Sequence, residues 1–213
     1  MWILLTILYL IQAHATNGAR ISESEFNAAV TSCGSPTPSP DIYPHFADGT
    51  KDFSREELAE FIAQLIHESG GFRYREEQAC LTGDRCAGSY IDNVGLPGKS
   101  YHGRGFIQLT WGANYKAASE ALGLGDQLLR EPELVSNNVK IAVDVSTWYW
   151  RDRVRPQVAS KKGQFGATTR AINGAIECSG GFNQRASNRY QCYLKVADAL
   201  KITNKDAENG CYN

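Results

Sequence analysis

The chain has 213 residues, and its 22 Lys and Arg nearly balance its 23 Asp and Glu, giving a formal net charge of −1 at pH 7. A nucleic-acid-binding protein normally carries a basic excess or a basic stripe, so this balance argues against a nucleic-acid partner. The length predicts one domain, or two at most, with enough chain to bury a sizeable core.

The first fifteen residues differ in composition from the rest of the chain. They contain no charged residue and carry an apolar run over 2–11, followed by Ala13 and Ala15. Small residues at these two positions are typical of a secretory cleavage site, and an apolar run this short cannot cross a bilayer. We therefore predict a signal peptide over 1–15, a short leader over 16–24 and a secreted, extracellular protein with no membrane association after cleavage.

Before residue 54 we expect a short helix over 25–32 and a surface loop over 35–40. The loop alternates Ser or Thr with Pro, which favours an extended, semi-rigid backbone. Too few residues precede this loop to form a domain of their own, so we predict a single domain over 25–213.

The clearest helical pattern lies over 54–69. Ser54 followed by Glu57 is the pattern of a capping box, in which each side chain bonds the backbone N–H of the other. Gly70 and Gly71 are expected to end the helix, because glycine readily takes the left-handed conformation of a helix end. Apolar residues spaced for one buried face run through the segment, namely Leu58, Phe61, Ile62 and Leu65.

Strand patterns are scarce in the rest of the chain, and at most a small hairpin is expected over 88–107. Four later segments have helical patterns, namely 112–123, 139–151, 166–172 and 184–200. The segment 184–200 has one buried side, which includes a charged residue. The residues on this side are Arg189, Tyr193, Val196 and Leu200. We therefore expect a mainly α fold, with long loops held by disulfides.

Six cysteines follow the predicted signal peptide, and they are Cys33, Cys80, Cys86, Cys178, Cys192 and Cys211. An even number in an exported chain indicates disulfides, with fifteen possible pairings. The chain has no Cys-x-x-Cys pair and its four histidines are scattered, so we expect no metal site.

The first candidate catalytic group is a carboxylate at the end of the helix over 54–69. Three residues after Leu65, the buried stripe reaches Glu68. Charged side chains are seldom buried without a partner or a function, and partial burial raises a carboxyl pKa toward the range that a general acid needs. The alternative is that the helix ends early and leaves Glu68 on the surface.

A second candidate is the pair Glu76 and Glu77, which follows the turn after this helix. Carboxylates at the two ends of such a turn could face each other across a cleft. A separation of about 6.5–9.5 Å would let one protonate a glycosidic oxygen while the other activates water on the opposite face. The alternative is a solvated charge cluster with Arg73 and Arg75.

The segment 101–115 combines glycines, aromatic rings and amide side chains in the order Tyr-His-Gly-Arg-Gly-Phe-Ile-Gln-Leu-Thr-Trp-Gly-Ala-Asn-Tyr. Flat rings can cover pyranose faces, and Asn or Gln can hydrogen-bond hydroxyl and acetamido groups. A phosphate-binding glycine loop would end in Lys followed by Ser or Thr, which this segment lacks. We interpret the segment as part of a sugar site.

Four blocks of the chain resemble family 19 glycoside hydrolases, the plant-type chitinases, and they occur in the family's order. Residues 61–72, Phe-Ile-Ala-Gln-Leu-Ile-His-Glu-Ser-Gly-Gly-Phe, resemble the family's His-Glu helix. Residues 101–111 resemble its Tyr-Gly-Arg-Gly-Pro-Ile-Gln-Leu-Thr/Ser block. Residues 169–178, Thr-Arg-Ala-Ile-Asn-Gly-Ala-Ile-Glu-Cys, look like its Ile-Asn-Gly-Gly-Leu-Glu-Cys segment. Arg185 and Arg189 stand where the family's helix carries two arginines.

The resemblance implies a lysozyme-like bilobal α-helical domain with a substrate cleft. It also implies a secreted endo-chitinase that acts on chitin or chito-oligosaccharides and inverts the anomeric centre without a metal or cofactor. Glu68 would be the general acid and Glu77, rather than Glu76, the general base, while Thr110 aligns with a residue that helps hold the attacking water. The short segment between the two glutamates implies the short-loop form of the family.

The resemblance further implies residues around this pair. Those expected to bind the sugar chain are His67, Tyr101, Gln108, Asn114 and Asn173. Glu177 and Arg189 are expected to form a charge network that supports Glu68, and an ordinary ion pair is the alternative. The resemblance implies the disulfide Cys178–Cys211, which fits the family's C-terminal bridge. For the other four cysteines we expect Cys80–Cys86 and Cys33–Cys192, with different pairings left open.

Two other functions stay open from the sequence. Related folds cleave bacterial peptidoglycan with similar glutamates, and both polymers carry N-acetyl groups. A non-catalytic chitin-binding antifungal protein belongs to a different class, but it would not need Glu68, Glu77 and Thr110 together. In each case we expect a monomer.

Overall fold

The computed structural model describes residues 21–83 and 86–213. The predicted signal peptide over 1–15 and the first part of the predicted leader over 16–24 lie outside the described residues. Within the described chain, helices dominate and the only extended pairing consists of isolated bridges. No helix in this part of the chain is both long and apolar enough to span a bilayer. The predicted mainly α fold is confirmed.

The helical elements in chain order are α1 (Glu23–Ser32), α2 (Ile42–Gly49), α3 (Arg55–Ser69), a 3₁₀ turn η1 (Gln78–Cys80), α4 (Gly112–Ala121), α5 (Gln127–Arg130), α6 (Leu134–Asn137), α7 (Val139–Tyr149), a π-helical turn η2 (Trp150–Val154), α8 (Arg155–Val158), α9 (Phe165–Glu177) and α10 (Gln184–Ala199). The predicted helices over 25–32, 54–69, 112–123 and 184–200 correspond to α1, α3, α4 and α10. The α2 helix was not predicted, because only Ile42 and Phe46 are buried in its two turns.

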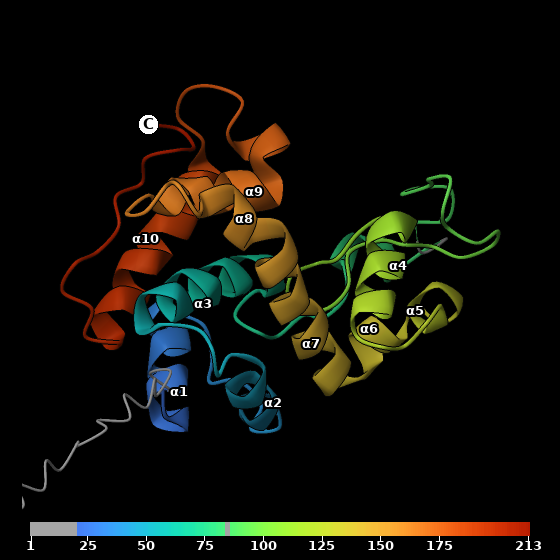
Figure 1. The fold of residues 1–213 in the computed structure, drawn as a ribbon, viewed down its shortest axis with the longest axis horizontal. Coiled ribbons are helices and arrows are strands. Elements are labelled where there is room, and N and C mark those ends of the chain that lie inside the picture. The colour runs from blue at the N-terminus through green and yellow to red at the C-terminus, as the bar shows by residue number, and fades with distance from the viewer. Residues whose placement is uncertain (1–20, 84–85) are drawn as a thin grey trace, which may run out of the picture.

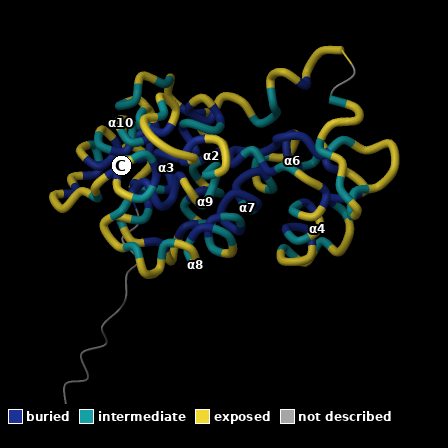
Figure 2. The backbone as a smooth tube through the Cα atoms, turned by 90° about the horizontal axis from the view of Figure 1, so that it is seen from above, coloured by how far each residue is buried: buried dark blue, intermediate teal, exposed yellow. Residues whose placement is uncertain are grey.

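The helices form two lobes of unequal size (Figure 1). In the larger lobe, α3 packs against α10 and α1, and α9 packs on α10. The smaller lobe contains α4, α5 and α6, and α7 joins the lobes by packing on α2 at one end and on α4 and α6 at the other. Figure 2 shows that buried backbone is concentrated along α3 and α7. The bilobal arrangement expected from the family resemblance is present.

The central helix α3 begins and ends where the sequence predicts. The Ser54 hydroxyl accepts the Glu57 N–H at 3.1 Å, and Gly70 ends the helix in the left-handed conformation with φ 59°. The predicted capping box is nevertheless only half formed. The Glu57 carboxylate accepts from Trp150 Nε1 at 2.8 Å and from Arg155 Nε at 2.5 Å. The Glu57 side chain therefore bonds residues of η2 and α8 and does not complete the cap at the start of α3.

The helix predicted over 139–151 does not stop there. It passes from α7 through the π turn η2 into α8. The Trp150 side chain is fully buried, with its ring 5.1 Å from the ring of Phe61. The helix predicted over 166–172 is also longer than expected, since α9 continues across a kink at Asn173 (φ −140°, ψ 33°).

The hairpin considered over 88–107 does not form. The end of that segment pairs instead with the chain just after α3. There Glu77 N–H donates to Gly103 O at 2.8 Å and Gly105 N–H donates to Arg75 O at 2.9 Å. The earlier part of the segment turns repeatedly through residues with positive φ, which interrupts a strand.

Three disulfides lie in the described chain, and two of them join residues far apart in sequence. They are the same three pairs named from the sequence, namely Cys33–Cys192, Cys80–Cys86 and Cys178–Cys211. The first links the end of α1 to α10, and the last links the end of α9 to the C-terminal segment. These two bridges hold α1 and the C-terminal segment against the helices that carry Arg189 and Glu177.

Candidate active site

Glu68 lies in the last turn of α3, where the helix approaches the surface. Its side chain is 16% exposed, and Oε1 lies 2.5 Å from Nη2 of Arg189 in an ion pair that lacks hydrogen-bond alignment. Burial raises the pKa of Glu68 above its ordinary value, although the charge of Arg189 acts in the opposite direction. Glu68 therefore holds its proton more strongly than an exposed glutamate, and a cation lies beside it.

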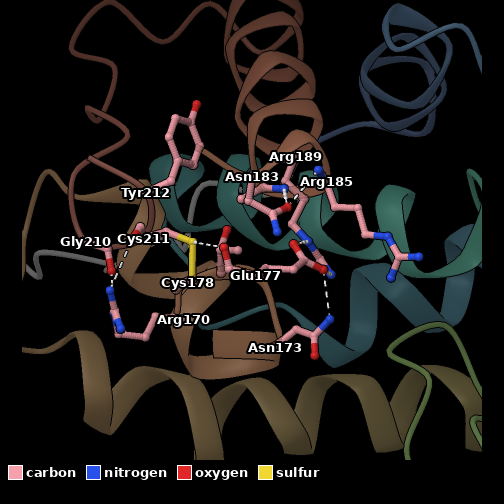
Figure 3. The surroundings of a disulfide bond; sticks show 12 residues. Arg170, Asn173, Glu177, Cys178, Asn183, Arg185, Arg189, Gly210, Cys211 and Tyr212 are labelled. Atoms are coloured by element: carbon pink, nitrogen blue, oxygen red, sulfur yellow. Dashed lines mark hydrogen bonds and ion pairs between the residues drawn. A yellow bond between two sulfur atoms is a disulfide. The ribbon is translucent and has the colours of Figure 1, made fainter. Parts of the chain in front are cut away.

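A second carboxylate, that of Glu177, also binds the Arg189 guanidinium (Figure 3). Arg189 Nε donates to Glu177 Oε2 and Nη2 donates to Oε1, both at 2.8 Å, and both side chains are 1% exposed. Asn173 Nδ2 donates to the same Oε1 at 2.8 Å. Burial acts to raise the pKa of Glu177, but the bonds from Arg189 and Asn173 outweigh it and hold the pKa below its ordinary value. Arg189 thus joins an ionised carboxylate to Glu68.

Gln64 is a further partner of Arg189 that the sequence analysis missed. Arg189 Nη1 donates to Gln64 Oε1 at 2.8 Å, and the Gln64 side chain is fully buried. Gln64 Nε2 donates in turn to the hydroxyls of Thr168 and Thr169, at 2.8 and 3.0 Å. The sequence does contain a sign of this role. Gln64 lies one helical turn before Glu68 among apolar residues, and a buried amide needs hydrogen-bond partners.

Glu76 and Glu77 are adjacent but lie in different surroundings. Glu76 Oε1 lies 2.8 Å from His102 Nε2 and 3.5 Å from Arg104 Nε. His102 and Arg104 are both almost fully buried. Glu76 is therefore part of an internal polar cluster that holds its segment against residues 102–104.

Glu77 is held by neutral donors instead. The Tyr90 hydroxyl donates to Oε1 at 2.9 Å, and the Gly103 N–H donates to Oε2 at 3.2 Å. Among the described residues, these two hydrogen-bond donors to Glu77 are uncharged, so they orient the carboxylate without neutralising it. The surroundings favour Glu77 over Glu76 as a group that can accept a proton from water.

Thr110, Asn114 and Gln108 lie half-buried near the start of α4. Asn114 Nδ2 donates to Thr110 O at 2.9 Å. Gln108 has a φ of 55° and its Nε2 donates to Gly105 O at 3.0 Å. These bonds use the amide nitrogens and fix the orientation of both side chains, and within the described residues no hydrogen bond uses the side-chain amide oxygens of Asn114 and Gln108.

Two other expected sugar-binding residues have distinct surroundings. Tyr101 is 2% exposed, and its hydroxyl accepts from Leu96 N–H and donates to Leu129 O. Its expected contact with substrate stays a prediction that this burial does not favour. His67 is half-buried next to Glu68, and burial followed by the charge of Arg189 lowers its pKa to about 4. His67 is therefore neutral near pH 7 and can act only as an uncharged hydrogen-bonding group.

Tyr90 and Trp111 are two aromatic residues at the site that were not among the individual residues expected there. Trp111 is 45% exposed at the start of α4, and its ring centroid lies 5.5 Å from that of Tyr90 in an edge-on contact. Trp111 stands within the aromatic segment already interpreted as a sugar site. Tyr90 lies in a stretch without periodicity, so only the fold reveals its contact with Glu77.

A cavity of about 560 Å³ adjoins this side of the site. Its wall comes from residues 87–104 and from Pro132 and Glu133, and it includes Tyr90 and His102. The two side chains that hold Glu77 and Glu76 thus also face this hollow. Among the described residues, no group of His, Cys, Asp and Glu is arranged to hold a metal ion.

The sequence matches known proteins over most of its length. A family model described as chitinase class I, glycoside hydrolase 19, matches residues 38–162. An endochitinase of Arabidopsis thaliana is 37% identical over 192 residues, which is 86% of this chain and 65% of that protein. A second Arabidopsis endochitinase is 40% identical over 160 residues, or 75% of this chain and 57% of that protein. The chain thus spans less than two thirds of the length of these relatives.

The fold matches solved structures more completely. Chitinase C from Streptomyces griseus HUT6037 has a TM-score of 0.70 at 29% identity, covering 92% of this chain and 100% of that chain. A class IV chitinase of family GH19 from Zea mays has a TM-score of 0.62 at 25% identity, covering 94% of this chain and 92% of that chain. The similarity therefore extends through both lobes.

Proposed function

Because this chain belongs to glycoside hydrolase family 19, the family of class I chitinases, we propose that it is an endo-chitinase. It hydrolyses β-1,4 bonds between N-acetylglucosamine units, with Glu68 as general acid and Glu77 as general base. Two observations together carry this proposal. A partly buried Glu68 is paired with Arg189, and Glu77, which follows the turn after α3, is held by neutral donors. Inverting hydrolysis needs one protonated and one ionised carboxyl group.

Glu68 supplies the proton. Since burial raises its pKa, the side chain stays protonated to a higher pH than an ordinary glutamate. When the C1–O bond breaks, its electron pair goes to the glycosidic oxygen, which takes the proton from Glu68. The carboxylate left behind lies 2.5 Å from Nη2 of Arg189, so its charge is compensated without a rearrangement.

Glu77 accepts the other proton. It draws a proton from a water molecule whose oxygen attacks C1 from the face opposite the leaving group, and Thr110 helps to hold that water. This geometry needs about 6.5–9.5 Å between the two carboxyl groups, and it converts a β-linkage into an α-anomer. No metal or cofactor takes part in these steps.

The substrate is a neutral sugar chain, and the groups proposed to bind it are neutral as well. They are His67, Gln108, Asn114 and Asn173, with the exposed face of Trp111 available for a pyranose ring. Asn173 also bonds Glu177, so its placement links sugar binding to the network behind Glu68. We extend the proposal to the short-loop form of the family and to a monomer.

We also propose that the protein is secreted. Three disulfides, two of them joining residues far apart in sequence, are typical of proteins that fold in an oxidising compartment. Expression with residues 1–15 intact should release a protein that begins after Ala15. N-terminal sequencing of the secreted product tests this point, and a retained N-terminus would contradict it.

The test of the activity uses the hexamer of N-acetylglucosamine, with products resolved by size and by anomer. We expect internal cleavage, the α-anomer in fresh product by NMR, and loss of turnover by at least about 100-fold in Glu68→Gln and in Glu77→Gln. Glu56→Gln is the matched control, because Glu56 is an exposed residue of the same helix. It should retain full activity.

Other results would redirect the assignment. Hydrolysis of bacterial walls without hydrolysis of chitin oligomers would assign the site to peptidoglycan. Oligosaccharide binding without turnover in the unmodified protein would indicate a binding protein. A β-anomer in fresh product would contradict the inverting roles of the two glutamates.

A further inference from the structure

Among the described residues, the Tyr90 hydroxyl is a side-chain donor to the proposed general base. It donates to Glu77 Oε1 at 2.9 Å, while the backbone N–H of Gly103 donates to Oε2 at 3.2 Å. Each oxygen of the carboxylate thus has one donor from a different segment. Two donors at opposite ends of a carboxylate fix the rotation of its plane, which a single donor cannot do.

The folded loop, and not the sequence next to Glu77, holds Tyr90 in place. Tyr90 has a φ of 55°, and its ring contacts Trp111 edge-on at 5.5 Å between centroids. Asp92 fastens the same loop, because its carboxylate accepts from Gly95 N–H at 2.7 Å and from Ala113 N–H at 2.8 Å. The second bond reaches the first turn of α4, so the loop and α4 move together.

We propose that Tyr90 is a positioning residue for the general base, and that its hydroxyl fixes the orientation of the Glu77 carboxylate toward the attacking water. This inference rests on the proposed function, since it concerns the proton that Glu77 takes from water. The remaining lone pairs on the two carboxylate oxygens are left for that water. Tyr90 transfers no proton itself, and no bond to it forms or breaks.

The charged and titratable groups around Glu77 are consistent with this role. Burial, followed by the neighbouring Glu77, raises the pKa of Tyr90, so its hydroxyl keeps its proton and remains a donor. Burial lowers the pKa of His102, which leaves Arg104 as the cation on the segment that packs here. Arg104 and His102 both contact Glu76, whereas the side chain that donates to Glu77 is the neutral Tyr90.

The test is Tyr90→Phe, which removes one oxygen and keeps the ring against Trp111. A carboxylate that is free to rotate is less often aligned with the attacking water, whereas the groups that bind the sugar chain are unchanged. We therefore expect kcat to fall about tenfold and KM to change less than about twofold. The control is Tyr43→Phe, which removes a hydroxyl that donates to Ile21 O at 2.7 Å in the larger lobe.

A double variant separates positioning from a structural effect. If Tyr90 acts through Glu77, then Tyr90→Phe should leave the residual rate of Glu77→Gln unchanged, because the interaction is already absent. An unchanged kcat in Tyr90→Phe, a loss that appears in KM and not in kcat, or a further tenfold loss on the Glu77→Gln background would overturn the inference. If the unmodified protein is inactive or Glu77→Gln remains active, the proposed function itself fails instead.

Discussion

Glu177→Gln probes the buried network behind the proposed general acid. The substitution keeps the side-chain shape but removes a carboxylate that is 1% exposed and accepts three hydrogen bonds, two from Arg189 and one from Asn173. Breaking one side of a buried ion pair costs about 3–5 kcal/mol, since the remaining charge stays buried. Glu68 remains as a second anion beside Arg189. We therefore expect the lower end of that range, about 3 kcal/mol, in the free energy of unfolding.

The same substitution should change the pH dependence of activity. Glu177 is one of the charges that raise the pKa of Glu68, whereas Arg189 lowers it. Without Glu177, Arg189 pairs with Glu68 alone, so the pKa of Glu68 falls. Because the general acid must be protonated, the basic limb of the pH–rate profile should move to lower pH.

Urea unfolding and a pH–rate profile on the hexamer measure both effects. Glu120→Gln is the matched control, since Glu120 pairs with Lys116 at 3.9 Å with both side chains more than half exposed. A pair of this kind contributes about 0.5 kcal/mol or less. The reasoning is refuted if Glu177→Gln is no more destabilising than this control, or if the basic limb stays in place or moves to higher pH.

Three further outcomes follow from particular contacts. Gly71→Ala should destabilise the fold by about 2 kcal/mol in urea, because Gly71 has a φ of 75° and an added Cβ would overlap the Ser35 side chain; a loss below the error of the measurement would contradict this. Replacing Cys33 and Cys192 by Ala opens a bridge across 159 residues and should cost roughly 5 kcal/mol by chain entropy, seen as a lower urea midpoint. The pKa of His67 is lowered to about 4, so between about pH 6.5 and that value the unfolded state binds a proton that the folded state does not. The unfolding free energy of the unmodified protein, relative to His67→Gln, should therefore decrease as pH falls through this window and stay constant above it.

The α3 helix illustrates how much of the site follows from local sequence. Its apolar spacing, its serine start and its glycine end all depend on residues within one helical turn of each other, and the structure places them as predicted. Glu68 follows from the same register, because it lies three residues beyond Leu65 on the buried side. The stripe of α10 likewise marks Arg189 as a buried charge, and the structure places it 1% exposed.

The hydrogen-bond partners of the side chains on these helices do not follow from local sequence. Glu57 bonds Trp150 across 93 residues and leaves its capping box incomplete. Arg189 bonds Gln64 across 125 residues. No local pattern contains either pairing, since several helices must dock before the two groups meet.

The sequence alone determined where the longer helices lie, that Glu68 and Arg189 face inward, and which family the motifs resemble. The family resemblance implied the network of Glu177 and Arg189 behind Glu68, but only the tertiary structure decided that Arg189 also bonds Gln64 and that Tyr90 holds Glu77. The physical reason is range. Helical periodicity and capping act between residues a few positions apart, whereas the electrostatics of a buried carboxyl group depend on whatever the folded chain brings within a few ångströms of it.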